Sequence, residues 1–162
     1  MRPVPTTPLD PRIKMVWRIN DAIWIVLGWL LTAGTIAFIG LIEPMDWIAP
    51  TLMATVVLLV ALLVIFLVVI PPIRYARWRF ELSPDFLDIQ LGIIWRKRFV
   101  IPFIRVQNTD TKQGPVLRAF GLSSVTISTA ADSHEIPGLD QKMAEEVRDR
   151  AAELARVARE DV

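Results

Sequence analysis

Basic side chains offer the clearest chemistry in this sequence. The candidates for contacts with lipid headgroups or a partner are Arg74, Arg77, Arg79, Arg96 and Arg98. Each cation close to a membrane surface is attracted to anionic lipid by about 1 kcal/mol. The alternative is a charged flank behind a membrane span followed by a solvated strand, in which Arg96 and Arg98 share one face and Lys97 takes the other. We expect these arginines to be attracted to the anionic membrane surface in general. Recognition of one specific lipid headgroup is a further hypothesis.

Catalytic and metal chemistry have weaker candidates. Ser133-His134-Glu135 contains the residue types of a nucleophilic relay, but adjacent strand residues point to opposite faces and cannot form one. A solvent-facing histidine is the simpler interpretation. The acids Asp85, Asp88 and Asp110 fall on different predicted elements, without the spacing of a metal site. We therefore expect no catalytic residue, no metal, no cofactor and no enzyme activity.

Composition narrows the classes further. The chain has 162 residues, of which 53% are hydrophobic and 22% charged, with no cysteine and one histidine. Disulfides, cysteine-based zinc sites and thiol catalysis are excluded. A net charge of +1 gives no global field for nucleic acid, so no nucleic-acid partner is expected.

The hydrophobic residues are concentrated in two runs, residues 22–42 and 47–70, which contain no charged residue. About 20 residues of helix cross the hydrocarbon core, so each run predicts a membrane span. Because neither run contains the ionisable groups of a transport path, the hairpin over residues 19–73 is interpreted as an anchor. Ala33 and Ala37 form a spacing that permits close helix packing.

Charge at the ends of the spans predicts their orientation. The connector contains Glu43 and Asp46 and no basic residue, whereas arginines and a lysine lie before the first run and after the second. The positive-inside rule therefore places both termini in the cytoplasm. Residues 1–18 contain Pro3, Pro5, Pro8 and Pro11, a density that predicts a mobile cytoplasmic tail without regular helix or strand.

Residues 74–162 change to an alternating pattern typical of half-buried strands. Trp78, Phe80 and Leu82 alternate with charged residues, and further strands are predicted at 87–91, 94–101, 104–112, 125–128 and 133–136. A helical turn is expected at 116–120. Asp140 is a plausible N-cap for an amphipathic helix over about 140–159. The predicted fold is a membrane α-helical hairpin plus an α+β cytoplasmic domain, a bent antiparallel sheet capped by a C-terminal helix.

Several short motifs then carry a family resemblance. Ile101-Pro102-Phe103-Ile104-Arg105-Val106-Gln107 is followed by Gly114-Pro115, by Arg118, Phe120 and Gly121, and by Ile136-Pro137-Gly138-Leu139. In this order, with Gly92 in Leu91-Gly92-Ile93, they resemble the bacterial pleckstrin-homology-like (PH-like) family of the YdbS type. That resemblance covers nearly the whole chain. It implies a small bacterial membrane protein in which a helical hairpin precedes a PH-like partial barrel.

The motif residues are interpreted as structural. Gly114, Gly121 and Gly138 are expected to meet backbone requirements, a positive φ or a tight turn. Arg118 is expected to pair with an acid or to cap carbonyls near its turn.

The function expected from these observations is membrane-anchored binding or scaffolding at the cytoplasmic face of the bacterial inner membrane. The partners would be the bilayer, further copies of the chain or another membrane protein, and anionic lipid. The alternative is an accessory subunit of a larger membrane complex, such as a transporter or an envelope-stress system, with the spans making the main contact.

Overall fold

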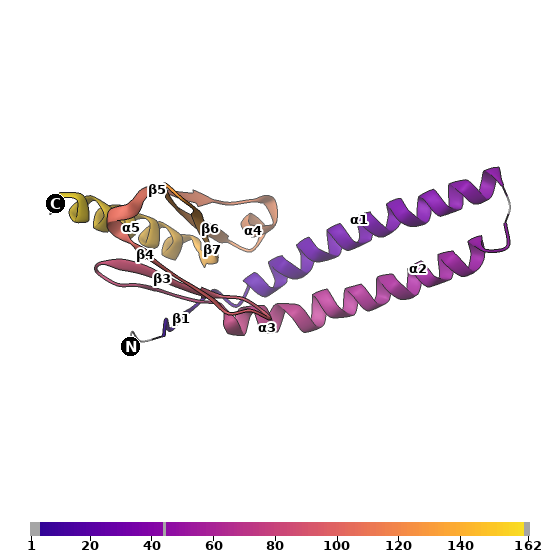
Figure 1. The fold of residues 1–162 in the computed structure, drawn as a ribbon, viewed down its shortest axis with the longest axis horizontal. Helices are drawn as coiled ribbons and strands as arrows, with labels where there is room; N and C mark the ends of the chain where they lie inside the picture. Colours follow the sequence, from indigo (N-terminus) through magenta and orange to yellow (C-terminus); the bar gives the residue numbers. More distant parts are fainter. Residues whose placement is uncertain (1–3, 44, 161–162) are drawn as a thin grey trace. The chain divides into compact units, whose positions relative to one another are not determined.

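The computed structural model describes residues 4–43 and 45–160, so Pro44 of the connector lies outside the described residues. The chain divides into two compact units (Figure 1). One contains Trp17–Pro72. The other joins the residues up to Val16 with those from Ile73 onward. Each unit is described by itself below.

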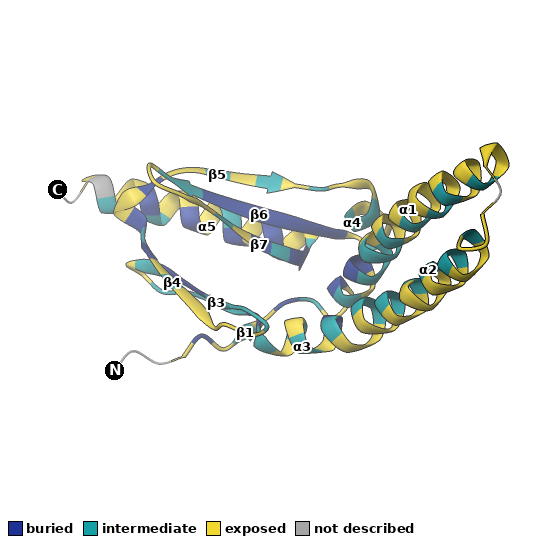
Figure 2. Cartoon of the chain, turned by 45° about the vertical axis from the view of Figure 1, so that its right-hand side comes forward, coloured by how far each residue is buried: buried dark blue, intermediate teal, exposed yellow. Residues whose placement is uncertain are grey.

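The helical unit is built from two long apolar helices. α1 is Ile13–Ile42, and α2 (Ile48–Leu63) continues without a break through η1 (Val64–Val69) and α3 (Ile70–Arg77). Both helices are long and apolar enough to cross a membrane. Their apolar side chains are largely exposed along the spans (Figure 2), as contact with lipid requires. The predicted span 22–42 lies inside α1, and the predicted span 47–70 lies inside the second helix except for Trp47, which immediately precedes α2.

The second long helix contains a π-helical stretch, η1, just before Pro71 and Pro72. Proline has no N–H to donate to the carbonyl four residues earlier, and its ring crowds that carbonyl. A local change from α to π hydrogen bonding is one way in which a helix accommodates such an interruption. The proline pair therefore explains why the irregular turn lies here.

The second unit contains two antiparallel sheets. The first has the order β1 (Thr7–Pro8), β2 (Arg79–Leu82), β3 (Phe86–Leu91) and β4 (Lys97–Pro102). After the 3-10 turn η2 (Phe103–Arg105), the second sheet has the order β5 (Val106–Lys112), β6 (Leu122–Thr129) and β7 (Ser133–Asp140). The short helix α4 (Pro115–Ala119) joins β5 to β6, and α5 (Gln141–Glu160) follows β7. Two antiparallel sheets followed by a C-terminal helix agree with the architecture that the family resemblance implies.

The core of this domain follows the predicted alternation. Trp78 and Phe80 from the β2 region, and Leu87 and Ile89 from β3, are buried. On α5 the buried face consists mainly of alanines at helical spacing, which lets the helix approach the sheet closely (Figure 2): Ala144, Val147, Ala151 and Ala155. Asp140 caps α5, because its carboxylate accepts a hydrogen bond from the Lys142 N–H at 3.1 Å.

The N-terminal segment differs from the expected tail. Thr7 and Pro8 pair with Phe80 and Arg79 of β2, Leu9 is 2% exposed, and α1 begins at Ile13. The proline density does exclude long elements here, but an edge strand of two residues needs few N–H donors. A segment predicted to be separate is therefore part of the domain.

The third strand of the domain also differs from expectation. The predicted strand began at residue 94, whereas β4 begins at Lys97 and residues 92–96 form a turn. Gly92 has a φ of +123°, and a Cβ built there would lie 1.9 Å from the Trp95 carbonyl oxygen. Only glycine permits this tight turn, which removes Ile94 and Trp95 from the sheet.

Candidate functional site

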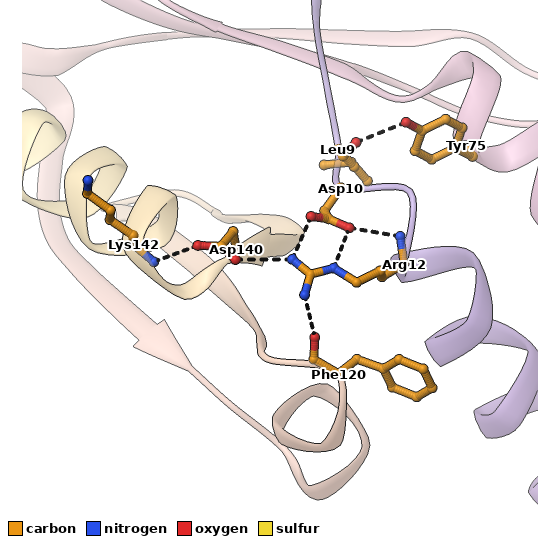
Figure 3. Close-up of polar contacts among 7 residues, drawn as sticks. All are labelled: Leu9, Asp10, Arg12, Tyr75, Phe120, Asp140 and Lys142. Carbon is orange, nitrogen blue, oxygen red and sulfur yellow. Dashed lines mark hydrogen bonds and ion pairs between the residues drawn. The ribbon is translucent and has the colours of Figure 1, made fainter.

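Arg12 joins the N-terminal segment to one end of the β6–β7 pair, where β6 begins and β7 ends (Figure 3). Its Nη1 donates to the Phe120 carbonyl oxygen at 3.0 Å, and its Nη2 donates to Asp140 Oδ2 at 3.0 Å. Asp10 holds the guanidinium in place through Oδ1, 3.0 Å from Nε, and Oδ2, 2.9 Å from Nη2. We call these four residues, Asp10, Arg12, Phe120 and Asp140, the Arg12 clasp.

The charges of the clasp stabilise one another. The hydrogen bond from the Arg12 side chain lowers the pKa of Asp10, although partial burial opposes this. The hydrogen bond to Asp10, and then that to Asp140, raises the pKa of Arg12 above its ordinary value. The clasp therefore remains an ion pair at neutral pH.

Further contacts fix the same segment to the domain. The Asp10 N–H donates to the Gly138 carbonyl oxygen at 3.1 Å, and the Tyr75 hydroxyl donates to the Leu9 carbonyl oxygen at 3.1 Å (Figure 3). The Lys14 ammonium lies 4.8 Å from the centre of the Tyr75 ring. The segment before α1 and the segment after α3 are thus part of one structure.

The three motif glycines differ in their backbone conformation and therefore in their roles. Gly138 has a φ of +61° at a register shift in β7, and a Cβ there would lie 2.4 Å from Ile13 Cδ1. Pro137 is tolerated beside it because β7 is an edge strand. Gly121 has a φ of +65° and directly follows the carbonyl that Arg12 binds. Gly114 has a φ of −74° and serves as the N-cap of α4, with Pro115 next to it, so it does not require the left-handed conformation.

Arg12 binds the Phe120 carbonyl near the turn that contains Arg118, while the role expected for Arg118 stays a prediction. Arg118 is exposed on α4, whereas Arg12 binds partners 108 and 128 residues away in sequence. A local motif contains no signal for such a distant contact, so sequence reasoning missed Arg12 as a site residue.

The five basic candidates do not form one patch. Arg98 Nε donates to both carboxylate oxygens of Asp88 at 3.0 Å, and Asp88 is 3% exposed. This hydrogen bond raises the pKa of Arg98. Arg79 Nη1 donates to the Tyr75 and Trp78 carbonyl oxygens, at 3.0 and 2.7 Å. These two arginines support the fold.

Of the remaining three candidates, Arg74 and Arg96 are exposed, whereas Arg77 is half-buried. Arg74 and Arg77 belong to the last turns of α3, and Arg96 is exposed in the turn before β4. The same turn exposes 83% of Ile94 and 80% of Trp95, a feature that sequence reasoning missed because the apolar run resembles a strand.

A groove lies at the end of the β6–β7 pair opposite the Arg12 clasp. The register pairs Leu122 with Asp140 at the clasp end and Ser128 with Ser133 at the other. Here a cavity of about 550 Å³ lies between η2, the start of β5 and the β6–β7 turn. We call it the distal groove. Its lining residues are Ile104, Arg105, Val106, Gln107, Thr129, Ala130 and Ala131.

The residues considered for catalysis do not converge. The Ser133 hydroxyl lies 2.9 Å from that of Ser128, while the half-buried His134 ring packs against Phe99 with ring centres 4.8 Å apart. Within residues 4–43 and 45–160, the structure shows no group of three or more potential metal ligands.

Comparison with known proteins agrees with this architecture. The family model described as "Bacterial PH domain" matches residues 22–155. The chain is 36% identical over 162 residues to the UPF0699 transmembrane protein YdbS of Bacillus subtilis (strain 168), covering 100% of both proteins. No solved structure matches. The family match and the full-length similarity to a transmembrane protein, together with the two apolar helices, show that this chain is a membrane protein of the bacterial PH domain family.

Proposed function

We propose that the chain is a non-enzymatic binding or scaffolding protein at the cytoplasmic face of the bacterial inner membrane, with both termini in the cytoplasm. One observation carries this proposal: the chain segments on both sides of the helical hairpin are built into the same domain. β1 pairs with β2, and the Arg12 clasp holds the residues just before α1. A partner bound to the domain is thereby attached to the membrane through two covalent connections rather than one flexible linker.

The distal groove is the surface we assign to a protein partner. It combines the exposed apolar side chain of Ile104 with the polar side chains of Arg105, Gln107 and Thr129, a mixture typical of interfaces. The exposed guanidinium of Arg105 favours a partner segment that presents a carboxylate.

Native mass spectrometry of the tagged full chain, gently extracted from its own membrane without overexpression, tests this proposal. We expect a complex of fixed stoichiometry, either with further copies or with a second protein, and a smaller complexed fraction for Arg105→Glu. Arg118→Glu is the matched control, since it makes the same charge change on the exposed face of α4. A chain that is monomeric in every preparation contradicts the proposed function, and a complex indifferent to Arg105→Glu contradicts the assigned groove.

A second candidate function, an accessory subunit that binds through its spans, is favoured by an opening in the helical unit. A cavity of about 310 Å³ lies between α1 and α2 and is lined by Gly28, Trp29 and Leu58 among others. Trp29 Nε1 is buried there without a hydrogen-bond partner. A third helix carrying a polar side chain could fill the opening and satisfy this N–H.

Two variants distinguish the two functions. An accessory subunit should lose its partner in Gly28→Leu, which fills the opening, and retain it in Arg105→Glu. The scaffold should show the reverse pattern in the same mass spectra.

A further inference from the structure

The turn at residues 92–96 presents the two most exposed large apolar side chains among the described residues of the domain. Ile94 is 83% exposed and Trp95 is 80% exposed, whereas Trp78 of the same domain is 4% exposed. Gly92 fixes this shape, because its φ of +123° and the close Trp95 carbonyl leave no room for a side chain. The exposure is therefore built into the turn.

Strand register shows where on the domain this turn lies. Arg79 at the start of β2 pairs with Gln90, and Leu91 at the end of β3 pairs with Lys97. The turn is thus at the end of the first sheet where β2 begins. β2 itself begins two residues after α3 ends at Arg77, where the second apolar helix ends.

The residues that follow the apolar tip are basic. Arg96 and Lys97 are exposed, while Arg98 is held by Asp88. Tryptophan is enriched at the boundary between headgroups and acyl chains, and nearby cations are attracted to anionic headgroups. An apolar tip followed by two cations, at the end of a sheet whose strand β2 begins two residues after the second apolar helix ends, has the composition of an interfacial membrane contact.

We propose that this turn inserts Ile94 and Trp95 into the interface of the same leaflet from which the second spanning helix emerges, with Arg96 and Lys97 on anionic headgroups. The inference rests on the proposed function only in assigning that leaflet to the cytoplasmic side. The lipid contact is thereby assigned to this one turn rather than to all five arginine candidates. The domain then has a lipid-facing end and, at the distal groove, a partner-facing end.

The test uses the full chain, whose lack of cysteine allows a nitroxide to be placed at a single Ile94→Cys. The protein is reconstituted at one copy per nanodisc in a mixture of phosphatidylglycerol and phosphatidylcholine. We expect the label to lose collisions with a water-soluble nickel complex and to gain collisions with oxygen, relative to a label at Ala131→Cys in the exposed β6–β7 turn. Equal accessibility of the two labels to the nickel complex overturns the proposal.

A charge variant tests the basic part of the contact. Arg96→Glu combined with Lys97→Glu should move the label at residue 94 toward water in discs that contain phosphatidylglycerol, while Arg118→Glu should not. An unchanged depth in the double variant contradicts the assignment of Arg96 and Lys97. Because these discs contain no partner protein, a failed insertion leaves the mass-spectrometric test of the proposed function intact, and a missing partner leaves the depth measurement intact.

Discussion

At the residue scale, the junction between the N-terminal segment and β7 requires a glycine, Gly138, because a side chain at this position would overlap with Ile13. Gly138 leaves the space that Ile13 occupies, and its carbonyl accepts the Asp10 N–H. Gly114 is a matched contrast, because its φ is −74° and no atom lies within 4 Å of a Cβ built there. Packing and backbone conformation therefore require glycine at position 138, whereas position 114 has room for a side chain.

Gly138→Ala should destabilise the domain by roughly 2–4 kcal/mol, because it combines a left-handed alanine with overpacking against Ile13. Gly114→Ala should remain within about 0.5 kcal/mol of the wild type, since the lost N-cap glycine and the reduced entropy of the unfolded chain offset each other. Thermal unfolding of the full chain in detergent, followed by near-ultraviolet circular dichroism, measures both. Equal effects of the two substitutions would show that Ile13 does not occupy the space beside Gly138.

Arg96 and Arg98, two of the five basic candidates, should respond differently to truncation to alanine. Arg98→Ala leaves the buried Asp88 carboxylate without its cation, and we expect the midpoint of thermal unfolding to fall by roughly 5–10 °C. Arg96→Ala, at an exposed turn position, should leave the midpoint unchanged in the same assay. A midpoint that is insensitive to Arg98→Ala would return this residue to the surface candidates.

Sequence reasoning predicts several buried residues and special backbone positions of the domain, but it does not predict which polar side chains contact one another. Alternation correctly predicts that Trp78 and Phe80 are buried, and the motif glycines mark Gly121 and Gly138 as special backbone positions. Arg12 and Asp88 could not be identified, because their importance arises from partners that only the folded chain brings near. An isolated Asp in an alternating strand is ordinarily solvated, and only the register to β4 places Arg98 beside Asp88.

At the scale of elements, the segment before α1 is the largest departure from expectation. Its prolines prevent a long strand, but Leu9 is buried and β1 extends the first sheet. The turn at residues 92–96 is the second departure, because a run of Ile, Ile and Trp favours strand unless the geometry of Gly92 is known. In both cases the local sequence preference was assessed correctly, but contacts with residues distant in sequence, or the backbone geometry of the turn, produced a different conformation.

Leu9→Ala distinguishes a docked segment from a tail. Removal of a fully buried leucine side chain should cost about 2–4 kcal/mol of unfolding free energy, whereas Val4→Ala at a position 58% exposed should cost less than about 0.5 kcal/mol. Denaturant unfolding of the two variants side by side provides the measurement. Identical stabilities would favour the tail.

Acid should weaken the same docking. The native pKa of Asp10 lies below its ordinary value of 3.8, so the stabilisation is fully present above that pH and is lost as the pH falls through the lowered native value. Between about pH 6 and pH 2, the unfolding midpoint of the wild type should fall more than that of Asp10→Asn, which has no proton to bind at this position. Parallel pH profiles of the two proteins would remove Asp10 from the clasp.

At the scale of the whole molecule, orientation is the property that decides which partners the domain can meet. Single cysteines at Asp46→Cys in the connector and Ala131→Cys in the domain should report opposite sides of the membrane. In intact cells whose outer layers are permeable to it, a membrane-impermeant maleimide should label residue 46 at once and residue 131 only after lysis. Labelling of residue 131 in intact cells would reverse the proposed orientation.

The dependence of the domain on residues from both sides of the hairpin has a consequence for biosynthesis. β1 and Arg12 leave the ribosome before either span, yet their partners Phe80, Phe120 and Asp140 are translated only after both spans. The domain can therefore close only when the hairpin has returned the chain to the compartment in which it began. A single span inserted alone, or a hairpin threaded through unevenly, leaves the first strand and its arginine across the bilayer from their partners. A chain inserted in that way would be left with an unfinished first sheet, because β1 could not reach β2.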